Sequence, residues 1–244
     1  MKQYLFAVTL IAGSIPANAQ TKQGTITYQR KADMHRRMED EQMKAMIPQF
    51  RTDKYILLFK DNISVYKSIA EEEAPDPFEN SGGNRIQIKI GGPGENAVKY
   101  KNFNNQKYFE QTELGDKDYI IDDTIKDQPW KLSDETKTVL NHVCKKATVK
   151  TERGSDVTAW YAEDIQTPAG PDNFSGLPGA ILLLDINNAE IVFTAVDIKT
   201  TADDKDLKEP AKGKHITRAD FEKKMDELFG PPTADGKRII TREN

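Results

Sequence analysis

Polar and apolar residues alternate along many short segments of this chain. Arg85–Ile90 alternates without a break, which places three isoleucines on one face of an expected strand, and 97–101 resumes the pattern after a turn rich in Gly and Pro. The segments 180–186 and 190–200 are apolar on both faces, which favours central strands. Similar runs occur at 24–30, 54–60, 63–69, 107–112, 119–122, 139–151 and 157–164. About ten short strands at close spacing predict an antiparallel, mainly β fold.

Two helices interrupt this pattern. One is expected over Asp33–Ile47, ended by Pro48. The other begins at Thr217, an expected N-cap, and carries four apolar residues at helical spacing before Gly230 ends it. No shift in composition divides the chain convincingly, so 20–244 is expected to be a single β-rich domain.

The first nineteen residues have the pattern of a signal peptide. Lys2 is followed by the apolar stretch Leu5–Ile15, and Ala17-Asn18-Ala19 fits a signal-peptidase site. The apolar stretch is too short for a permanent membrane span. We therefore expect an exported protein, periplasmic or secreted, with a signal peptide at 1–19 and a mature chain that begins at Gln20.

Composition excludes several classes of function. The 244 residues carry a formal net charge of -4, unlike the basic surfaces that bind nucleic acid. A single Cys excludes an internal disulfide framework and a multi-Cys zinc site. Common hydrolase and nucleotide-binding motifs are missing, so no catalytic residue and no cofactor are assigned, and we do not expect an enzyme.

One nucleophile pair was considered among the three histidines and the single cysteine. His142 and Cys144 lie two residues apart in an expected strand and therefore point to the same face. Parallel side chains rarely close to hydrogen-bond distance, and a free catalytic thiol in an exported protein is prone to oxidation. The favoured interpretation is a buried, unreactive cysteine.

A methionine-rich segment offers a second kind of site. Met34, His35 and Met38 lie within one arc of the first expected helix, and thioether and imidazole ligands suit monovalent copper. The more common role of such methionines is to line a core or a groove, because the unbranched side chain adapts to irregular apolar surfaces. Copper handling is therefore kept as the alternative function.

The segment before the strand 180–186 is dense in Gly and Pro. Leu177-Pro178-Gly179 suits a type II turn, in which Pro178 fixes φ and Gly179 takes a positive φ. The segment resembles the hallmark of the GLPGLI family, with Ala180 where the motif that names the family has Leu. The residues that carry the resemblance are Trp160, Gly170, Pro171, Phe174, Gly176, Leu177, Pro178 and Gly179. The resemblance implies an exported protein of a Gram-negative envelope and carries over no catalytic residue.

A weaker likeness concerns overall shape. A helix near the N-terminus followed by many antiparallel strands is similar to the half-barrels of periplasmic lipoprotein carriers. The expected fold is therefore mainly β (α+β), a curved antiparallel sheet or half-barrel with two helices on its concave side. The expected function is that of a non-enzymatic binding or accessory protein, with an apolar small molecule or an envelope protein as its partner.

Native mass spectrometry of the exported chain tests these expectations together. The measured mass is expected to fit residues 20–244, which begin at Gln20. An added mass of lipid size would support the carrier, and bound copper would support the methionine site. A bare monomer would count against both and leave a protein partner as the remaining expectation.

Overall fold

The computed structural model describes residues 21–38, 40–69 and 96–231. The expected signal peptide, the expected strand at 85–90 and the C-terminal tail lie outside the described residues. The strands are β1 (Gln23–Asp33), β2 (Phe50–Lys60), β3 (Ile63–Ser68), β4 (Val98–Asn102), β5 (Lys107–Leu114), β6 (Lys117–Thr124), β7 (Lys131–Val139), β8 (His142–Lys150), β9 (Asp156–Ala162), β10 (Ala180–Ile186), β11 (Ile191–Lys199) and β12 (Lys214–Thr217). The helices are a 3-10 turn (His35–Arg37), α1 (Glu41–Met46) and α2 (Arg218–Phe229).

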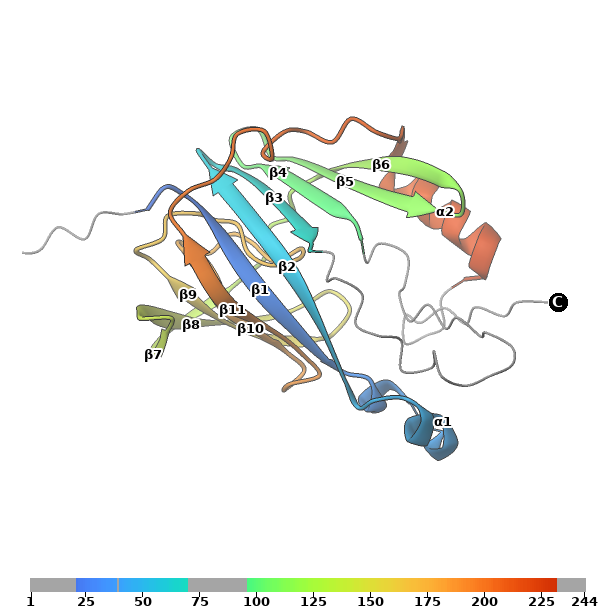
Figure 1. Cartoon of the computed structure of the whole chain (residues 1–244), viewed down its shortest axis with the longest axis horizontal. Helices are drawn as coiled ribbons and strands as arrows, with labels where there is room; N and C mark the ends of the chain where they lie inside the picture. The colour runs from blue at the N-terminus through green and yellow to red at the C-terminus, as the bar shows by residue number, and fades with distance from the viewer. Residues whose placement is uncertain (1–20, 39, 70–95, 232–244) are drawn as a thin grey trace, which may run out of the picture.

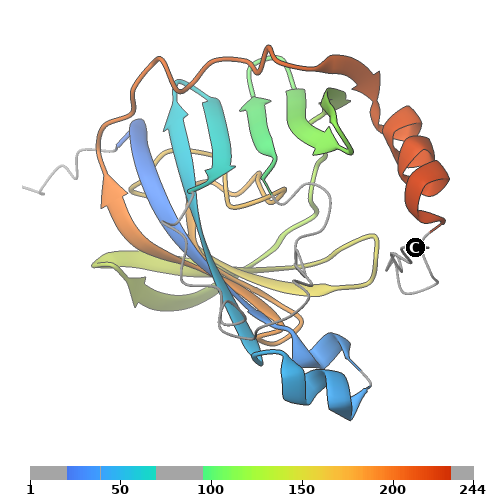
Figure 2. The ribbon, with the colours of Figure 1, turned by 45° about the vertical axis from the view of Figure 1, so that its right-hand side comes forward.

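All twelve strands belong to one sheet, in the order β12-β6-β5-β4-β3-β2-β1-β11-β10-β9-β8-β7. Neighbouring strands are antiparallel, except that β12 runs parallel to β6. The sheet curves strongly about its long central strands, and the curvature gives it a concave and a convex face (Figures 1 and 2). The expectation of a mainly β, curved antiparallel sheet is confirmed. Among the described residues no helix is long and apolar enough to cross a membrane.

The concave face holds the main core. Strand alternation directs Tyr28, Leu57, Phe59 and Leu184 to this face, where each is almost fully buried. Packing of about two dozen such residues removes them from water, and each large side chain contributes roughly 1.5–3 kcal/mol of transfer free energy. This apolar core lies against β1, β2 and β8–β11, the central and C-terminal part of the sheet.

A second layer covers the convex face. Leu58, Val65 and Tyr100 form a small buried cluster there, with Leu207 of the connector between β11 and β12 packed against it. Two ion pairs fasten this connector, Lys60–Asp204 at 2.7 Å and Lys67–Asp206 at 3.1 Å. The charged connector therefore lies along the sheet, with its aspartates held by lysines of β2 and β3.

Helix α2 is placed as the sequence predicts. The Thr217 hydroxyl accepts a hydrogen bond from the backbone N–H of Asp220 at 3.1 Å, which caps the helix. Gly230, with φ of 75°, ends it. Phe221 and Met225 pack against β5 and β6 on the concave side of the sheet. This end of the concave face therefore has its own small apolar cluster.

The first helix differs from the expectation. Asp33 ends β1, and its carboxylate accepts hydrogen bonds from the backbone N–H groups of His35 and Arg36, which start a separate 3-10 turn. Asp40 accepts from the N–H of Gln42 and begins the short α1. Local side-chain caps therefore divide the segment in two. The segment projects beyond the ends of β1 and β2 (Figure 1). The expectation that this helix lies on the concave side of the sheet is therefore wrong.

The strands β7 and β12 were not expected from the sequence, and the expected strand 139–151 has different limits in the structure. The expected strand 139–151 is found as β8, but it begins only at His142, because Leu140 and Asn141 both take positive φ and turn the chain between β7 and β8. The strand β7 is exposed or half-buried at every position, so no hydrophobic period marks it. The short β12 pairs in parallel where only antiparallel pairing was expected. The Asn187-Asn188 turn between β10 and β11 is confirmed, since both residues have positive φ.

The segment 163–179 between β9 and β10, here called the β9–β10 loop, fills the concave face. Ile165, Phe174 and Leu177 of this loop are buried in the main core. Gly179 was expected to take a positive φ, and this is wrong: the positive φ of 91° belongs to Gly176. Gly179 is required for a different reason, because a Cβ atom there would lie 2.1 Å from the carbonyl oxygen of Ala162.

Substitution of Gly179 by Ala is therefore expected to destabilise the protein by about 3 kcal/mol or more, because backbone atoms must separate to admit the methyl group. Gly115→Ala is the control. Gly115 has φ of 66° but open space around it, so only backbone strain of about 1–2 kcal/mol applies. Urea denaturation measures both variants. Equal losses in the two variants would contradict a role for the close approach at Gly179.

Candidate functional site

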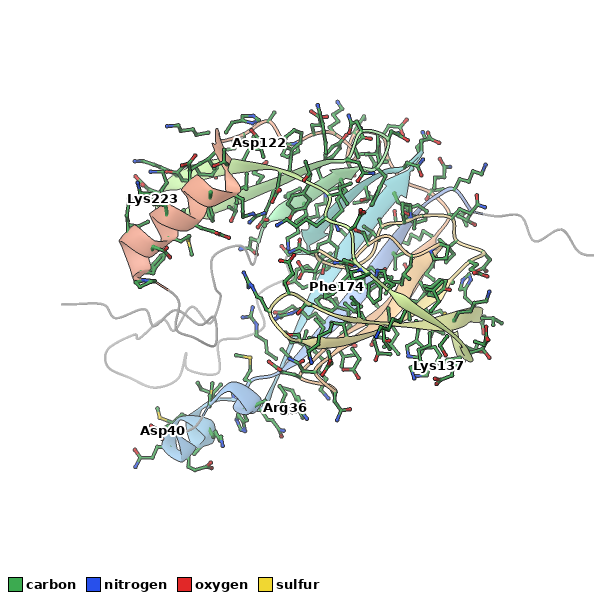
Figure 3. The ribbon with its side chains drawn as sticks, turned by 180° about the vertical axis from the view of Figure 1, so that it is seen from behind. Arg36, Asp40, Asp122, Lys137, Phe174 and Lys223 are labelled. Carbon is green, nitrogen blue, oxygen red and sulfur yellow. The ribbon has the colours of Figure 1, made fainter. Side chains whose placement is uncertain are left out.

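The β9–β10 loop brings the GLPG-containing segment to the middle of the molecule. Phe174 lies among the side chains enclosed by the sheet (Figure 3). The Trp130 ring packs beside it at a centroid distance of 6.2 Å, and the Trp130 indole N–H donates to the Ser175 carbonyl at 2.9 Å. The Gln128 side chain accepts from the Ser175 N–H at 3.1 Å and donates to the Asn173 carbonyl at 3.2 Å. The segment before β7 therefore fixes the loop through its backbone.

Polar residues line the concave face where this loop meets β3–β6. Strand register places Tyr66, Lys99 and Glu110 directly opposite one another on β3, β4 and β5. The next row contains Ser64, Lys101, Tyr108 and Asp123. All members of the two rows are buried or nearly so, although four of them carry ionisable charges. We call these seven residues the polar rows.

The loop tip completes the polar rows. The Asp172 carboxylate forms an ion pair with the Lys99 ammonium, and Lys101 Nζ donates to the Asp172 carbonyl oxygen at 3.1 Å. The Asn173 side-chain oxygen accepts from the Tyr108 hydroxyl at 3.1 Å and from Lys99 Nζ at 3.2 Å. Buried charges are tolerated when they are paired and hydrogen-bonded, as here. The loop tip and the polar rows together form the candidate site.

Helix α2 contributes a further cation to this network. The Arg218 guanidinium, in the first turn of α2, binds the Glu110 carboxylate at 2.7 Å and the Asp123 carboxylate at 3.4 Å. The Arg218 guanidinium also lies 5.9 Å from the centre of the Tyr108 ring. Sheet, helix and loop are therefore joined at one place by charge-assisted hydrogen bonds.

The pKa values of Lys99 and Lys101 shift in opposite directions, although both side chains are buried. Burial lowers the pKa of Lys101 to about 7, and the neighbouring positive charge of Lys99 adds to this effect. Burial also opposes the charge of Lys99, but the carboxylates of Asp172 and Glu110 outweigh it and raise its pKa. For Asp172, burial is outweighed by the charges of Lys99 and Lys101, and its pKa is lowered. The site therefore holds a stable ion pair beside an amine that titrates near neutral pH.

Sequence reasoning missed the polar rows. The alternation in β4 and β5 was recognised, but it places Tyr100 and Phe109 on the convex face and the charged residues inside. A polar set on an alternating strand usually faces solvent. Only the β9–β10 loop, distant in sequence, turns this face into an interior one.

The GLPG-type motif residues do not all gather at the site. Gly170, Pro171, Phe174, Gly176, Leu177, Pro178 and Gly179 belong to the β9–β10 loop, and Gly170 has no room for a Cβ, which would lie 2.6 Å from Ile181 Cδ1. Trp160 lies on β9 on the opposite face from Ala159 and Tyr161, with the Lys137 ammonium 5.1 Å from its ring centre.

The methionine segment lies away from this site. His35 Nε2 lies 2.7 Å from the Ile47 carbonyl oxygen, which can only accept a hydrogen bond, so Nε2 is the donor of this pair. Met34 and Met38 flank the 3-10 turn and are half-buried. No group of three or more His, Cys, Asp or Glu that could hold a metal ion occurs within the described ranges. Copper binding by Met34, His35 and Met38 stays a prediction.

Cys144 and His142 do not form a nucleophile pair in this structure. The Cys144 thiol is buried and donates to the His142 carbonyl oxygen at 3.6 Å. Burial, followed by the Asp164 charge, raises the pKa of Cys144 to about 11, so the thiol is protonated at neutral pH. The His142 ring instead binds the Asp164 carboxylate through Nδ1 at 2.6 Å.

The low pKa of Lys101 makes a measurable contribution to stability. Between about pH 7 and its ordinary value near 10.4, the unfolded lysine binds a proton that the folded one lacks, so stability rises with pH over this window. Lys101→Met is expected to remove this rise, which is at most about 1.4 kcal/mol per pH unit. Urea denaturation from pH 6 to 10 measures it. The exposed Lys150→Met is the control, and an unchanged slope in Lys101→Met would contradict the assignment.

Solved structures share this fold, among them two structures of PNGF-II. A structure of PNGF-II in space group C2 superposes with a TM-score of 0.56 and 17% identity, covering 82% of this chain and 32% of that chain. A second, in space group P21, gives the same TM-score and identity, covering 84% and 33%. The chain thus spans about a third of the length of the PNGF-II chains it matches. No curated protein matches the sequence.

A family model relates the sequence itself to known proteins. The model is described as "N-glycanase peptide, N-terminal domain", and it matches residues 51–226. This range runs from β2 into α2 and includes the β9–β10 loop and the polar rows. Because the match covers well over half of the chain, the protein belongs to the family of N-glycanase peptide N-terminal domains.

Proposed function

We propose that this protein is an exported, non-enzymatic binding domain whose ligand is polar, the carbohydrate of a glycopeptide. The observation that carries the proposal is the candidate site itself. A row of hydroxyl, amide and charged groups is fixed in an otherwise apolar concave face, and precisely oriented polar groups of this kind provide specificity for polar ligands. The ligand is expected to contact the loop tip at Asp172 and Asn173.

Two further observations support this proposal. The family to which the chain belongs is described by the words N-glycanase peptide, which directs attention to glycopeptides. Residues 1–19 have the pattern of a leader, which supports export to the periplasm or the medium. The resemblance of 160–181 to the GLPGLI family, which was noted from the sequence, also agrees with an envelope location and stays a prediction.

The same geometry argues against an apolar carrier. The sequence left open an apolar ligand in a groove beside the methionine helix. That helix projects from the sheet, while the concave face is filled by Ile165, Phe174 and Leu177 of the β9–β10 loop. An apolar ligand placed elsewhere on this face would lie against the paired charges of Lys99 and Asp172, which favours a polar ligand. An envelope protein as partner remains compatible with a binding role.

A non-enzymatic role is proposed because the groups best suited to catalysis are committed elsewhere. The Cys144 thiol is buried and protonated. Nδ1 of His142 is bound to the Asp164 carboxylate in the β9–β10 loop, and Nδ1 of His215 is bound to the Asp122 carboxylate on β6. Lys101, the amine that titrates near neutral pH, is almost fully buried beneath the loop tip. Binding without chemistry is therefore the simplest use of the site.

The proposal is tested with the chain 20–244 and a glycopeptide that carries one N-linked glycan. Isothermal titration calorimetry is expected to show at least tenfold tighter binding to the glycopeptide than to the same peptide without its glycan. Asp172→Asn removes the charge that orients the loop tip and is expected to weaken binding about tenfold. Asp116→Asn, in the exposed turn between β5 and β6, is the matched control and is expected to bind normally.

Two results would overturn this proposal. Equal affinity for the peptide with and without its glycan would exclude the carbohydrate as the ligand. Release of the glycan during the incubation, detected as a change in the mass of the peptide, would exclude a non-enzymatic role. Normal binding by Asp172→Asn would place the ligand away from the loop tip.

A further inference from the structure

Among the described residues, one hydroxyl group of the candidate site, that of Tyr66, has no hydrogen-bond partner. The Tyr66 side chain is 5% exposed, and its hydroxyl is enclosed with no donor or acceptor in reach among the described residues. Nearly all buried polar groups in folded proteins are paired, because an unpaired one loses its hydrogen bonds to water without replacement. The Tyr66 hydroxyl therefore requires an explanation.

Other buried tyrosines of the same face are satisfied within the protein. The Tyr28 hydroxyl donates to the Ile181 carbonyl oxygen at 2.6 Å. The Tyr108 hydroxyl lies 2.9 Å from the Glu110 carboxylate and 3.1 Å from the Asn173 side-chain oxygen. Tyr66 differs from these two residues, because its hydroxyl is fully enclosed and has no partner among the described residues.

The surroundings of Tyr66 are those of a polar ligand site. Its ring stacks on that of Tyr55, with centroids 5.2 Å apart and planes within 6° of parallel, which fixes its direction. Its strand partner on β4 is Lys99, which holds the Asp172 carboxylate. Burial raises the pKa of Tyr66, and the negative charge of Asp172 is the next largest cause, which agrees with the position of Tyr66 opposite Lys99, the partner of Asp172.

The Asp172 carboxylate is the part of this ion pair that a ligand can reach from solvent. Its side chain is 36% exposed, whereas the Lys99 side chain that it binds is only 11% exposed. Asp172 also has φ of 55°, a left-handed conformation that is uncommon outside glycine and that occurs often at ligand-binding positions. The Asp172 carboxylate is therefore more accessible to solvent than the ammonium group that it binds.

We propose that Tyr66 is a ligand-binding residue, whose hydroxyl donates a hydrogen bond to a hydroxyl group of the bound carbohydrate, while that group donates in turn to Asp172. This inference rests on the proposed function and names the residues that would recognise the ligand. A neutral hydroxyl fits because it can accept and donate at once. A second carboxylate would be repelled by Asp172, and an ammonium group would be repelled by Lys99.

The test compares two substitutions that each remove one hydroxyl. Tyr66→Phe is expected to leave the melting temperature of the ligand-free chain unchanged or raised, because no internal hydrogen bond is lost. Tyr28→Phe is the matched control and is expected to lower it, because the bond to Ile181 is lost. Titration with the glycopeptide carrying one N-linked glycan is expected to show at least tenfold weaker binding for Tyr66→Phe and wild-type affinity for Tyr28→Phe.

Each other outcome overturns a stated part of the inference. If Tyr66→Phe binds the glycopeptide as tightly as the wild type, the hydroxyl is not a ligand-binding group and only this inference fails. If Tyr66→Phe lowers the melting temperature as much as Tyr28→Phe, the hydroxyl has a partner within the protein. If the wild-type chain itself binds no glycopeptide, the proposed function fails, and the ligand named for Tyr66 fails with it.

Discussion

The structure depends on one docking event, the insertion of the β9–β10 loop into the concave face of the sheet. Without this loop, the inner sides of β1, β2, β10 and β11 would expose a large apolar surface to water, and the polar rows would be solvated. Insertion requires the close approach of Gly179 to Ala162, because any side chain at Gly179 would meet the backbone. It also requires a polar contact at the loop tip, which the ion pair between Lys99 and Asp172 provides.

The concave face therefore has two regions with different energetics. The apolar region around Tyr28, Leu57 and Leu184 contributes stability through burial, which is not directional. The polar region contributes less net stability, because desolvation of each charge offsets much of its pairing energy. The polar region instead fixes orientation, because Lys99, Lys101 and Tyr108 hold Asp172 and Asn173 of the loop tip through directional hydrogen bonds.

In this polar region, two side chains of the same type have pKa values that are shifted in opposite directions. Lys99 and Lys101 are two residues apart on one face of β4, yet the pKa of Lys99 is raised and that of Lys101 is lowered. The difference arises because Lys99 is in direct contact with the Asp172 carboxylate, whereas Lys101 donates to a backbone carbonyl oxygen, and burial and the charge of Lys99 together outweigh the attraction of Asp172. The Tyr66 hydroxyl, on the neighbouring strand, has no hydrogen-bond partner in the part of the chain that the structure describes. Position within the fold, and not residue type, decides the chemistry of each group.

The sequence by itself determined those features that depend on neighbours along the chain. Alternation located most strands, the Asn187-Asn188 turn was found from residue type, and the Thr217 cap with Gly230 set the limits of α2. The same signals failed where partners are distant. β7 has no apolar period because its pairing with β8 specifies it, and the first helix broke because Asp33 and Asp40 cap separate turns.

Only the tertiary structure decided the site. The Gly- and Pro-rich segment was recognisable as a rigid turn, but its destination was not, because Asp172 and Lys99 are 73 residues apart in sequence. Alternation shows that Lys99, Lys101 and Glu110 share a face of the sheet, and it cannot show whether that face meets water or a loop. A buried charge and a solvated one have the same local sequence pattern, and only long-range contacts distinguish them.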